Sequence, residues 1–244
     1  MAPDFEKVEL AGGRAVLYRA DCLEVLAAGL LKCDAIVTDP PYGIGFQHSG
    51  DKKPRAIVDT LGNERSSTLV RSRGCKIIGD DAPFDPAPWL SFSRVLFFGA
   101  DRFRDRLPIG GSFLCWDKSV GIGPADSFVD AEFLWTNLQS VRRNAFRHLW
   151  KGITGEGKDR TAKGRPRHHV SQKPREVMRW CIETVRSPIR GTICDPYAGS
   201  GSTGIAALSL GYRFIGVEID PDHFETARAR IADFWEKHGA GDAA

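Results

Sequence analysis

Short runs of β-branched and aromatic residues alternate along the chain with stretches whose apolar residues recur at helical spacing. The predicted strands are Ala15–Tyr18, Ala35–Thr38, Arg94–Phe98, Ser112–Trp116, Glu132–Thr136, Thr192–Cys194 and Arg213–Val217. The predicted helices are Cys22–Leu30, Pro174–Val185, Ser202–Leu210 and Asp222–Trp235. Strands that alternate with helices favour a mostly parallel sheet covered by helices on both faces. The pattern therefore predicts an α/β fold.

Three segments depart from this alternation. Residues 112–150 contain two or three strand-like runs and no clear helix, which favours an antiparallel hairpin at one edge of the sheet. Segments 43–76 and 151–170 are polar, contain glycine and are longer than ordinary connections, so we predict functional or disordered loops there. A chain of 244 residues without a repeat is expected to form one domain, residues 1–244.

The charge of the chain is unevenly distributed. The whole chain carries a net charge of +3, but residues 141–175 carry +9 and the remainder therefore carries −6. An acidic body with one strongly basic segment indicates a polyanionic partner at one face. A solvated loop that binds nothing is the alternative interpretation of the charge alone.

Several classes of protein do not fit the sequence. No apolar run approaches the roughly 20 residues that a membrane span needs, and the acidic start MAPDFEKVEL does not resemble a secretion signal. The six cysteines form no CxxC pair, and His148, His168 and His169 are spaced too irregularly for a metal site. We therefore predict a cytoplasmic protein with free thiols, without a membrane partner or a metal ion.

A glycine-rich turn follows the predicted strand Thr192–Cys194. The run from Asp195 to Gly204 reads DPYAGSGSTG and leads into a helix, whose first N–H groups face the turn. Glu218 ends the next strand, 23 residues after Asp195, where a carboxylate can accept hydrogen bonds from ribose hydroxyls. The turn lacks both the GxGxxG spacing and the lysine of a phosphate-binding loop. An adenosine that carries an amino-acid tail would suit it better.

A second motif, Asp39-Pro40-Pro41-Tyr42, follows the buried-type strand Ala35–Thr38. The two prolines fix a rigid turn at the carboxyl end of the strand, which is where ligands bind in open α/β sheets. Hydrogen bonds from an aromatic amine to Asp39 and to the Pro40 carbonyl would free the nitrogen lone pair for attack on a methyl group. Tyr42 would stack on the base, which must leave the duplex to enter the site. A structural Pro-Pro turn with a capping Asp is the alternative for this motif taken alone.

In this order, the motifs resemble those of the amino-methyltransferases of DNA. DPPY matches their catalytic motif, and DPYAGSG is similar to their DPF-x-G-x-G motif, with Tyr197 in place of Phe. The segment 169–174, HVSQKP, resembles the HPxQKP segment of the permuted beta group, in which the catalytic motif precedes the cofactor motif; Val170 departs from the usual Pro. The resemblance covers nearly the whole chain and includes phage-borne and restriction-modification members.

The resemblance implies a Rossmann-like fold with a seven-stranded sheet, a reversed edge strand and helices on both faces. It implies S-adenosyl-L-methionine as cofactor and Asp39, Pro40, Pro41 and Tyr42 as catalytic residues. The residues that it places at the cofactor are Asp21, Cys22, Asp39, Lys173, Asp195, Pro196, Tyr197, Ala198, Gly199, Ser200, Gly201, Glu218 and Ile219. Within the group, Asp39 favours adenine N6 as the target, because SPPY is commoner among cytosine N4 enzymes.

Double-stranded DNA is the expected partner, and segments 43–76 and 142–170, which would flank the cleft, are the predicted DNA-contacting loops. Basic side chains there would neutralise phosphates, and a few side chains would read base edges. The candidates are Arg142, Arg143, Asn144, Arg147, Lys151, Arg165 and Arg167. Because the chain has no room for a large recognition domain, it must read DNA with these loops, with a second subunit in a homodimer, or loosely.

Three alternatives to adenine methylation stay open. Methylation of cytosine N4 in DNA needs the same site, and methylation of RNA or of a protein amide needs a similar one. A protein-glutamine enzyme would more often carry Asn in place of Asp39. A non-catalytic nucleic-acid-binding protein would be expected to have a damaged motif, whereas both motifs are intact in the sequence.

Overall fold

The computed structural model describes residues 5–45, 57–58, 64–65, 77–120, 130–151, 154–155, 172–185 and 191–239. The strands of its main sheet are β1 (Glu6–Leu10), β2 (Ala15–Arg19), β3 (Ala35–Thr38), β6 (Val95–Phe98), β7 (Ser112–Asp117), β8 (Ala131–Thr136), β9 (Ala145–Arg147), β12 (Thr192–Asp195) and β13 (Arg213–Glu218). The α-helices are α1 (Cys22–Ala27), α2 (Arg175–Val185), α3 (Ser202–Ser209) and α4 (Pro221–His238). Short pieces complete the description: η1 (Ala11–Gly13), η2 (Ala87–Trp89), η3 (Arg104–Arg106) and the strand pairs β4 (Ile57–Val58) with β5 (Glu64–Arg65) and β10 (Trp150–Lys151) with β11 (Thr154–Gly155).

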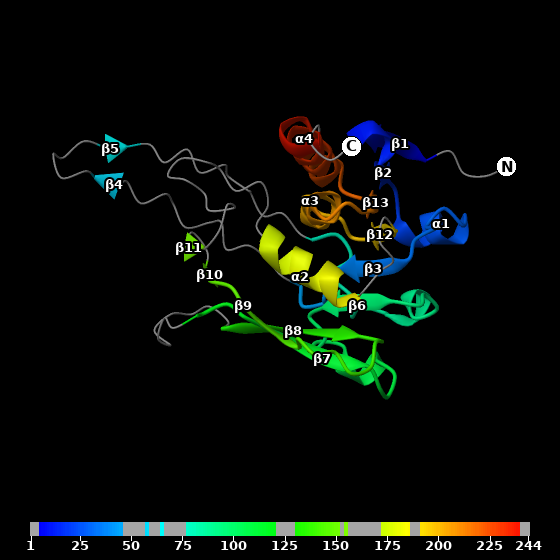
Figure 1. The fold of residues 1–244 in the computed structure, drawn as a ribbon, viewed down its shortest axis with the longest axis vertical. Coiled ribbons are helices and arrows are strands. Elements are labelled where there is room, and N and C mark those ends of the chain that lie inside the picture. The colour runs from blue at the N-terminus through cyan, green and yellow to red at the C-terminus, as the bar shows by residue number, and fades with distance from the viewer. Residues whose placement is uncertain are drawn as a thin grey trace.

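The main sheet has the order β1-β2-β13-β12-β3-β6-β8-β7-β9, and from β1 to β7 this order runs from the top to the bottom of Figure 1. Five adjacent strands are parallel to one another, namely β2, β13, β12, β3 and β6. Strand β8 is antiparallel to both β6 and β7. The predicted α/β class and the antiparallel hairpin are therefore confirmed. The number of strands was wrong, because the sheet has nine described strands instead of seven. The edge strand β1 is reversed, being antiparallel to β2, and a second reversed strand, β8, lies inside the sheet, because β7 and β9 continue beyond it.

The central strands are buried on both faces. Val37 and Phe98 pack in a core that also contains residues of α2, α3 and α4, whereas Ile36 and Phe97 pack in a second core with residues of α1 and η2. Successive side chains of a strand point to opposite faces, so this alternation places three helices on one face of the sheet and shorter elements on the other. Parallel strands covered in this way have continuous apolar sequences, as in AIVT of β3.

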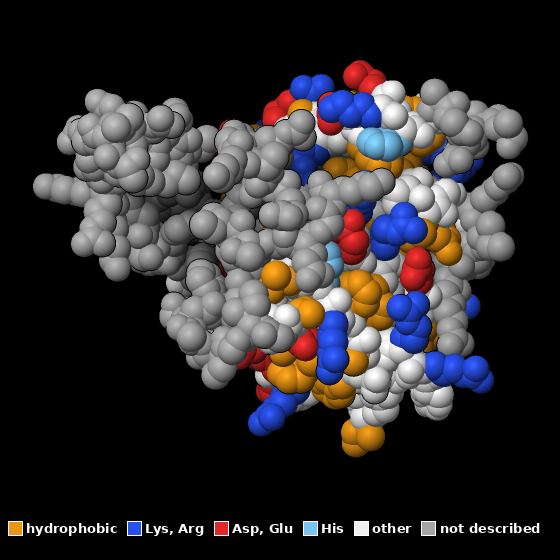
Figure 2. All heavy atoms as spheres, turned by 60° about the vertical axis from the view of Figure 1, so that its left-hand side comes forward, with side chains coloured by type: hydrophobic (Ala, Val, Ile, Leu, Met, Phe, Trp, Pro, Cys, Tyr) orange, Lys and Arg blue, Asp and Glu red, His pale blue; other side chains and the backbone are white. Residues whose placement is uncertain are grey.

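Most of the predicted loops fall outside the described residues. Segment 43–76 is described at 43–45, 57–58 and 64–65, and segment 142–170 at 142–151 and 154–155. Arg165 and Arg167 lie outside the description, as does the side chain of Lys151 in β10. On the face shown in Figure 2, described basic and acidic side chains are interspersed with apolar ones. The contact of the basic segment with a polyanionic partner therefore remains a prediction from the sequence.

The described residues include five cysteines and all the α-helices named above. Cys22, Cys33, Cys115, Cys181 and Cys194 are free thiols, and three of them are buried. Among the described residues, no helix is both long enough and apolar enough to cross a membrane.

Candidate active site

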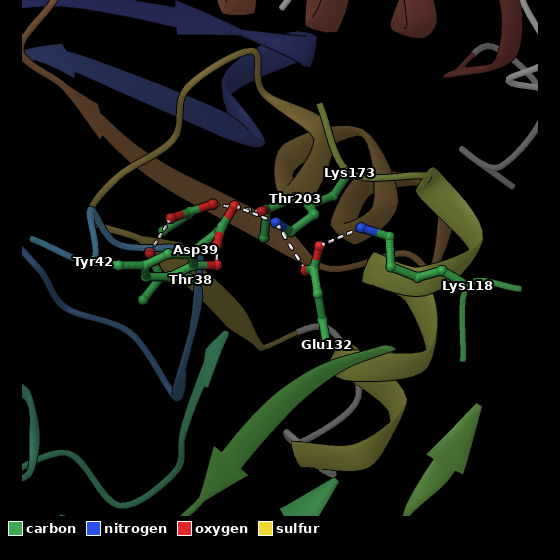
Figure 3. A network of polar contacts seen from close by, with 8 residues as sticks. Thr38, Asp39, Tyr42, Lys118, Glu132, Lys173 and Thr203 are labelled. Atoms are coloured by element: carbon green, nitrogen blue, oxygen red, sulfur yellow. Dashed lines mark hydrogen bonds and ion pairs between the residues drawn. The ribbon is translucent and has the colours of Figure 1, made fainter. Parts of the chain in front are cut away.

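The two sequence motifs meet at one edge of the sheet. Strands β3 and β12 are parallel neighbours, with Ile36 opposite Cys194, so their carboxyl ends lie side by side. The Thr38 hydroxyl, at the end of β3, donates a hydrogen bond of 2.6 Å to Asp195 Oδ1, at the end of β12. Figure 3 shows Thr38 next to Asp39. The predicted catalytic loop and the predicted cofactor turn are thus joined by a direct, buried hydrogen bond.

Asp195 is the centre of this junction. Its carboxylate also accepts hydrogen bonds from the Thr203 hydroxyl of α3 and from the Tyr197 backbone N–H at 3.1 Å. Asp195 is only 3% exposed, and burial raises the pKa of its carboxyl from 3.8 to about 6 despite these donors. In this structure Asp195 therefore holds the turn together, and its predicted contact with a cofactor would be an additional role.

The shifted pKa of Asp195 predicts a pH dependence of stability. The pKa of Asp195 is higher in the folded protein than in the unfolded chain. Its contribution to the free energy of unfolding is therefore fully present near pH 4 and is lost as the pH rises through about 6. The shift corresponds to about 3 kcal/mol. Asp195→Asn keeps the shape but cannot ionise, so the wild-type protein should lose stability relative to this variant between pH 4 and pH 7. Urea unfolding at both pH values measures the difference, and parallel pH profiles would contradict the prediction.

The glycine turn leaves space for a ligand. Gly199 and Gly201 have φ values of +51° and +77°, which side chains rarely adopt. A Cβ added at Gly199 would meet no atom closer than 3.9 Å, so the space beside the turn is open. Glu218 Oε2 accepts the Gly199 N–H at 2.7 Å and Oε1 accepts the Asp220 N–H at 2.8 Å. Each oxygen keeps a second lone pair, so the carboxylate can also accept hydrogen bonds from ribose hydroxyls.

The other predicted cofactor residues lie around Glu218. Strand β2 is parallel to β13, and the Ala20 N–H donates to the Glu218 carbonyl at 3.2 Å, which brings Asp21 and Cys22 to the same edge. Asp21 caps α1 by accepting the Leu23 N–H. Ile219 is 44% exposed. The structure thus brings the predicted adenosine-side residues together, as the sequence led us to expect.

An aromatic wall behind the turn was not predicted. The ring of Tyr197 makes edge contacts with Phe84 and with Trp89, at centroid distances of 5.9 and 6.1 Å. Its hydroxyl lies at the Cys22 thiol, whose pKa burial raises to about 11. The neutral thiol and these rings make the surroundings of the turn apolar. Only the aromatic character of residues 84 and 89 signals this in the sequence, because their loop shows no periodicity.

The catalytic loop is held from two sides. The Asp80 carboxylate, buried and far along the chain, accepts the N–H groups of Gly43 and Ile44 at 2.8 and 3.2 Å. The Tyr42 ring packs against Gly99, where a Cβ would lie 2.1 Å from a ring carbon. The rigid turn predicted from Pro40 and Pro41 therefore depends on two residues that the sequence did not single out. An aspartate beside a glycine, as in Gly79-Asp80, is too common a turn signal to have revealed this contact.

Both carboxylate oxygens of Asp39 have partners. The Tyr42 hydroxyl donates to Oδ1, and the Lys173 ammonium lies 2.7 Å from Oδ2 (Figure 3). Burial and the nearby Asp39 raise the pKa of Tyr42 well above its usual range, so the phenol keeps the proton that it donates. Lys173 lies between Asp39 and Glu132, and these carboxylates raise its pKa although burial lowers it. Lys173, predicted at the cofactor, thus contacts the catalytic carboxylate.

Four of the predicted DNA contacts have described side chains. Arg142, Arg143, Asn144 and Arg147 are exposed. The two former border a small cavity of about 280 Å³ with Trp180, Glu183 and Thr184 on the second half of α2. Lys173, in contrast, precedes the first turn of α2, and the helix rise puts roughly 10 Å between the two places. The role of these residues in DNA binding stays a prediction.

The sheet order, the glycine turn after β12 and the acidic residue at the end of β13 define a Rossmann-like methyltransferase fold. A solved structure titled as a complex of M1.HpyAVI with SAM superposes with a TM-score of 0.52, at 21% identity, over 89% of this chain and 98% of that one. That likeness concerns the fold.

Sequence comparisons point to the same class. Residues 124–229 match the family model described as DNA methylase. A protein named as a methylase, YubD of Escherichia coli (strain K12), is 28% identical over 88% of each chain. The type II methyltransferase M.ScaI of Streptomyces caespitosus is 23% identical over 88% of this chain and 81% of its own. The type II methyltransferase M2.DpnII of Streptococcus pneumoniae is 39% identical, over 26% of this chain and 23% of its own.

Proposed function

We propose that this chain is a DNA methyltransferase that uses S-adenosyl-L-methionine to methylate the exocyclic amine of a base. The observation that carries the proposal is the hydrogen bond between Thr38 and Asp195, which sets the Asp39 carboxylate beside a turn suited to a nucleoside. The match to the DNA methylase model and the methyltransferase names of the relatives support it.

The cofactor side of the site fits S-adenosylmethionine, which when bound supplies an electrophilic methyl group. Glu218 has free lone pairs for ribose hydroxyls, and Asp21 and Cys22 lie beside it for the adenine end. The open space beside Gly199 can take the amino-acid tail. The remaining turn residues, Pro196, Ala198, Ser200 and Gly201, hold this shape through backbone contacts such as that of the Ala198 N–H with the Val217 carbonyl at 2.9 Å.

On the catalytic side, the chain activates the target amine by accepting one hydrogen bond from each of its two N–H groups. Asp39 accepts one hydrogen bond and the Pro40 carbonyl accepts the other, which frees the nitrogen lone pair for in-line attack. The amine takes the place of the Tyr42 hydroxyl at Asp39 Oδ1, and the freed Tyr42 ring stacks on the base. The base reaches this pocket by flipping out of double-stranded DNA. Lys173 meanwhile stays on Oδ2, where its ammonium pairs with the carboxylate.

We favour adenine N6 as the target because Asp39 opens the DPPY motif. Cytosine N4 is the alternative, because its amine can be held by the same two acceptors. Exposing unmethylated plasmid DNA to the protein and then sequencing the modified positions distinguishes the two bases and gives the recognition sequence.

Transfer of a labelled methyl group from S-adenosylmethionine to plasmid DNA tests the proposal. Asp39→Asn should lower the rate by about 100-fold or more, because one acceptor of the amine becomes a donor. Asp233→Asn, on the exposed face of α4 and paired with Lys237, is the matched control and should be as active as the wild type. A wild-type protein that binds DNA without transferring methyl groups would refute the proposal, and an Asp39→Asn variant with full activity would refute the role of Asp39.

A further inference from the structure

We infer that Glu132, a residue of the reversed strand β8, is a positioning residue for methyl transfer that acts on Asp39 through Lys173. The inference rests on the proposed function. It adds a residue from outside both sequence motifs, together with its own partner, Lys118. These two residues would determine where the Lys173 ammonium lies and how much of its charge Asp39 receives.

Four side chains of alternating charge form a chain that ends at the catalytic loop (Figure 3). Lys118 Nζ lies 2.8 Å from Glu132 Oε1, Lys173 Nζ lies 3.1 Å from Glu132 Oε2, and Lys173 Nζ lies 2.7 Å from Asp39 Oδ2. The Lys118, Glu132 and Lys173 side chains are 18, 22 and 12% exposed, so solvent screens these contacts only weakly. Each lysine also lies over an aromatic ring, Lys173 at 5.0 Å from Phe98 and Lys118 at 5.2 Å from Trp116.

The position of Glu132 is difficult to explain by stability. It lies on the same face of β8 as the buried residues Leu134 and Thr136, where an apolar side chain would pack without desolvating a charge. Replacing buried ion pairs by apolar residues is often neutral or stabilising. Glu132 is nevertheless ionised, because Lys173 and Lys118 lower its pKa against the effect of burial. Glu132 is a charged group at a largely buried position, and only Lys173 separates it from the Asp39 carboxylate. Such a placement indicates a role in the site.

The geometry gives that role a mechanism. An ammonium paired with a single carboxylate would draw charge from it and weaken it as a hydrogen-bond acceptor. Glu132 shares the Lys173 charge, so Asp39 keeps more negative charge for the target amine. Lys118 in turn holds Glu132 Oε1, and Oε2 lies 3.1 Å from the Lys173 ammonium.

The experiment compares single-turnover methyl transfer to plasmid DNA by the wild type, Glu132→Gln, Lys118→Met and Lys118→Arg. We expect Glu132→Gln to lower the transfer rate about tenfold, Lys118→Met less, and Lys118→Arg hardly at all, because arginine restores the charge. Calorimetric titration with S-adenosylhomocysteine should give dissociation constants within about twofold of the wild type for all of them, because none of the altered residues lies at the adenosine end. Glu225→Gln, which removes a carboxylate from an exposed ion pair with Arg228, is the matched control.

Each result decides the inference. A lower transfer rate with unchanged cofactor affinity, measured below the unfolding transition of every variant, supports it. Full activity of Glu132→Gln overturns it, and so does a parallel loss of S-adenosylhomocysteine affinity in the folded variant, since that would give Glu132 a different role. A wild-type protein that transfers no methyl group overturns the proposed function itself, before any variant is compared. The two failures are therefore distinguishable.

Discussion

Replacing Lys173 by methionine should abolish methyl transfer and lower the free energy of unfolding by about 3 to 5 kcal/mol. Methionine has nearly the same length but no charge, so Asp39 and Glu132 would face each other without the cation that now lies 2.7 and 3.1 Å from them. Breaking a buried ion pair by removing one partner leaves an uncompensated charge. Urea unfolding and labelled methyl transfer measure the two effects.

A second substitution tests the cause of the Lys173→Met effect. Adding Glu132→Gln to Lys173→Met removes one of the two facing carboxylates and should recover part of the lost stability, but none of the activity, because Asp39 still lacks its partner. Arg102, paired with Asp101 at an exposed site, provides a control for loss of a cation, and Arg102→Met should change stability by less than about 1 kcal/mol. A Lys173→Met protein as stable as the wild type would show that the ion pairs contribute nothing.

Gly99→Ala is expected to inactivate the protein by displacing Tyr42. Gly99 has a φ of +67°, and an added Cβ would lie 2.1 Å from a Tyr42 ring carbon, so the ring must leave the place from which it would stack on the base. Gly29 has a φ of +68° with no atom within 4 Å of an added Cβ, which makes Gly29→Ala a matched control for backbone strain alone. The free energy of unfolding of the Gly29→Ala control should fall by about 1 to 2 kcal/mol. Gly99→Ala should lose roughly 1 to 3 kcal/mol more, from overpacking.

Thermal unfolding and methyl transfer measure the Gly99→Ala effects. Combining Gly99→Ala with Tyr42→Ala removes the ring that the new methyl group would overlap. The double variant should therefore lose only the stability lost by Tyr42→Ala plus the backbone strain at position 99, without the additional cost of overpacking. Equal effects of Gly29→Ala and Gly99→Ala would mean that the ring accommodates the methyl group without cost, and the proposed link between Gly99 and the catalytic loop would be wrong.

The central strands and the cofactor turn could be predicted because their signals are local. Strand β3 is the continuous apolar run Ala35–Thr38 that the sequence indicates, and the turn after β12 carries its glycines in one stretch. Strand β1 was not predicted, because its sequence, EKVEL, is largely exposed at a sheet edge and shows no buried run. The same holds for the insertion of β8 between β6 and β7, which depends on long-range pairing.

The site was predicted to the same extent. The two motifs lie side by side, joined by Thr38 and Asp195, and the side chains that support them come from distant strands and loops. Glu132 could have been noticed as a charged residue at an inward position of a predicted strand, whereas its pairing with Lys173 requires the sheet order. Asp80 reaches Gly43 through a contact between two loops, for which periodicity gives no signal.

The hydrogen bond between Thr38 and Asp195 has a thermodynamic consequence. It joins the loop for the target base to the turn for the cofactor, so neither can shift without straining or breaking a buried bond of 2.6 Å. We therefore expect the two ligands to bind cooperatively. By thermodynamic linkage, if the bound cofactor raises the affinity for the extruded base by some factor, the bound base raises the affinity for the cofactor by the same factor.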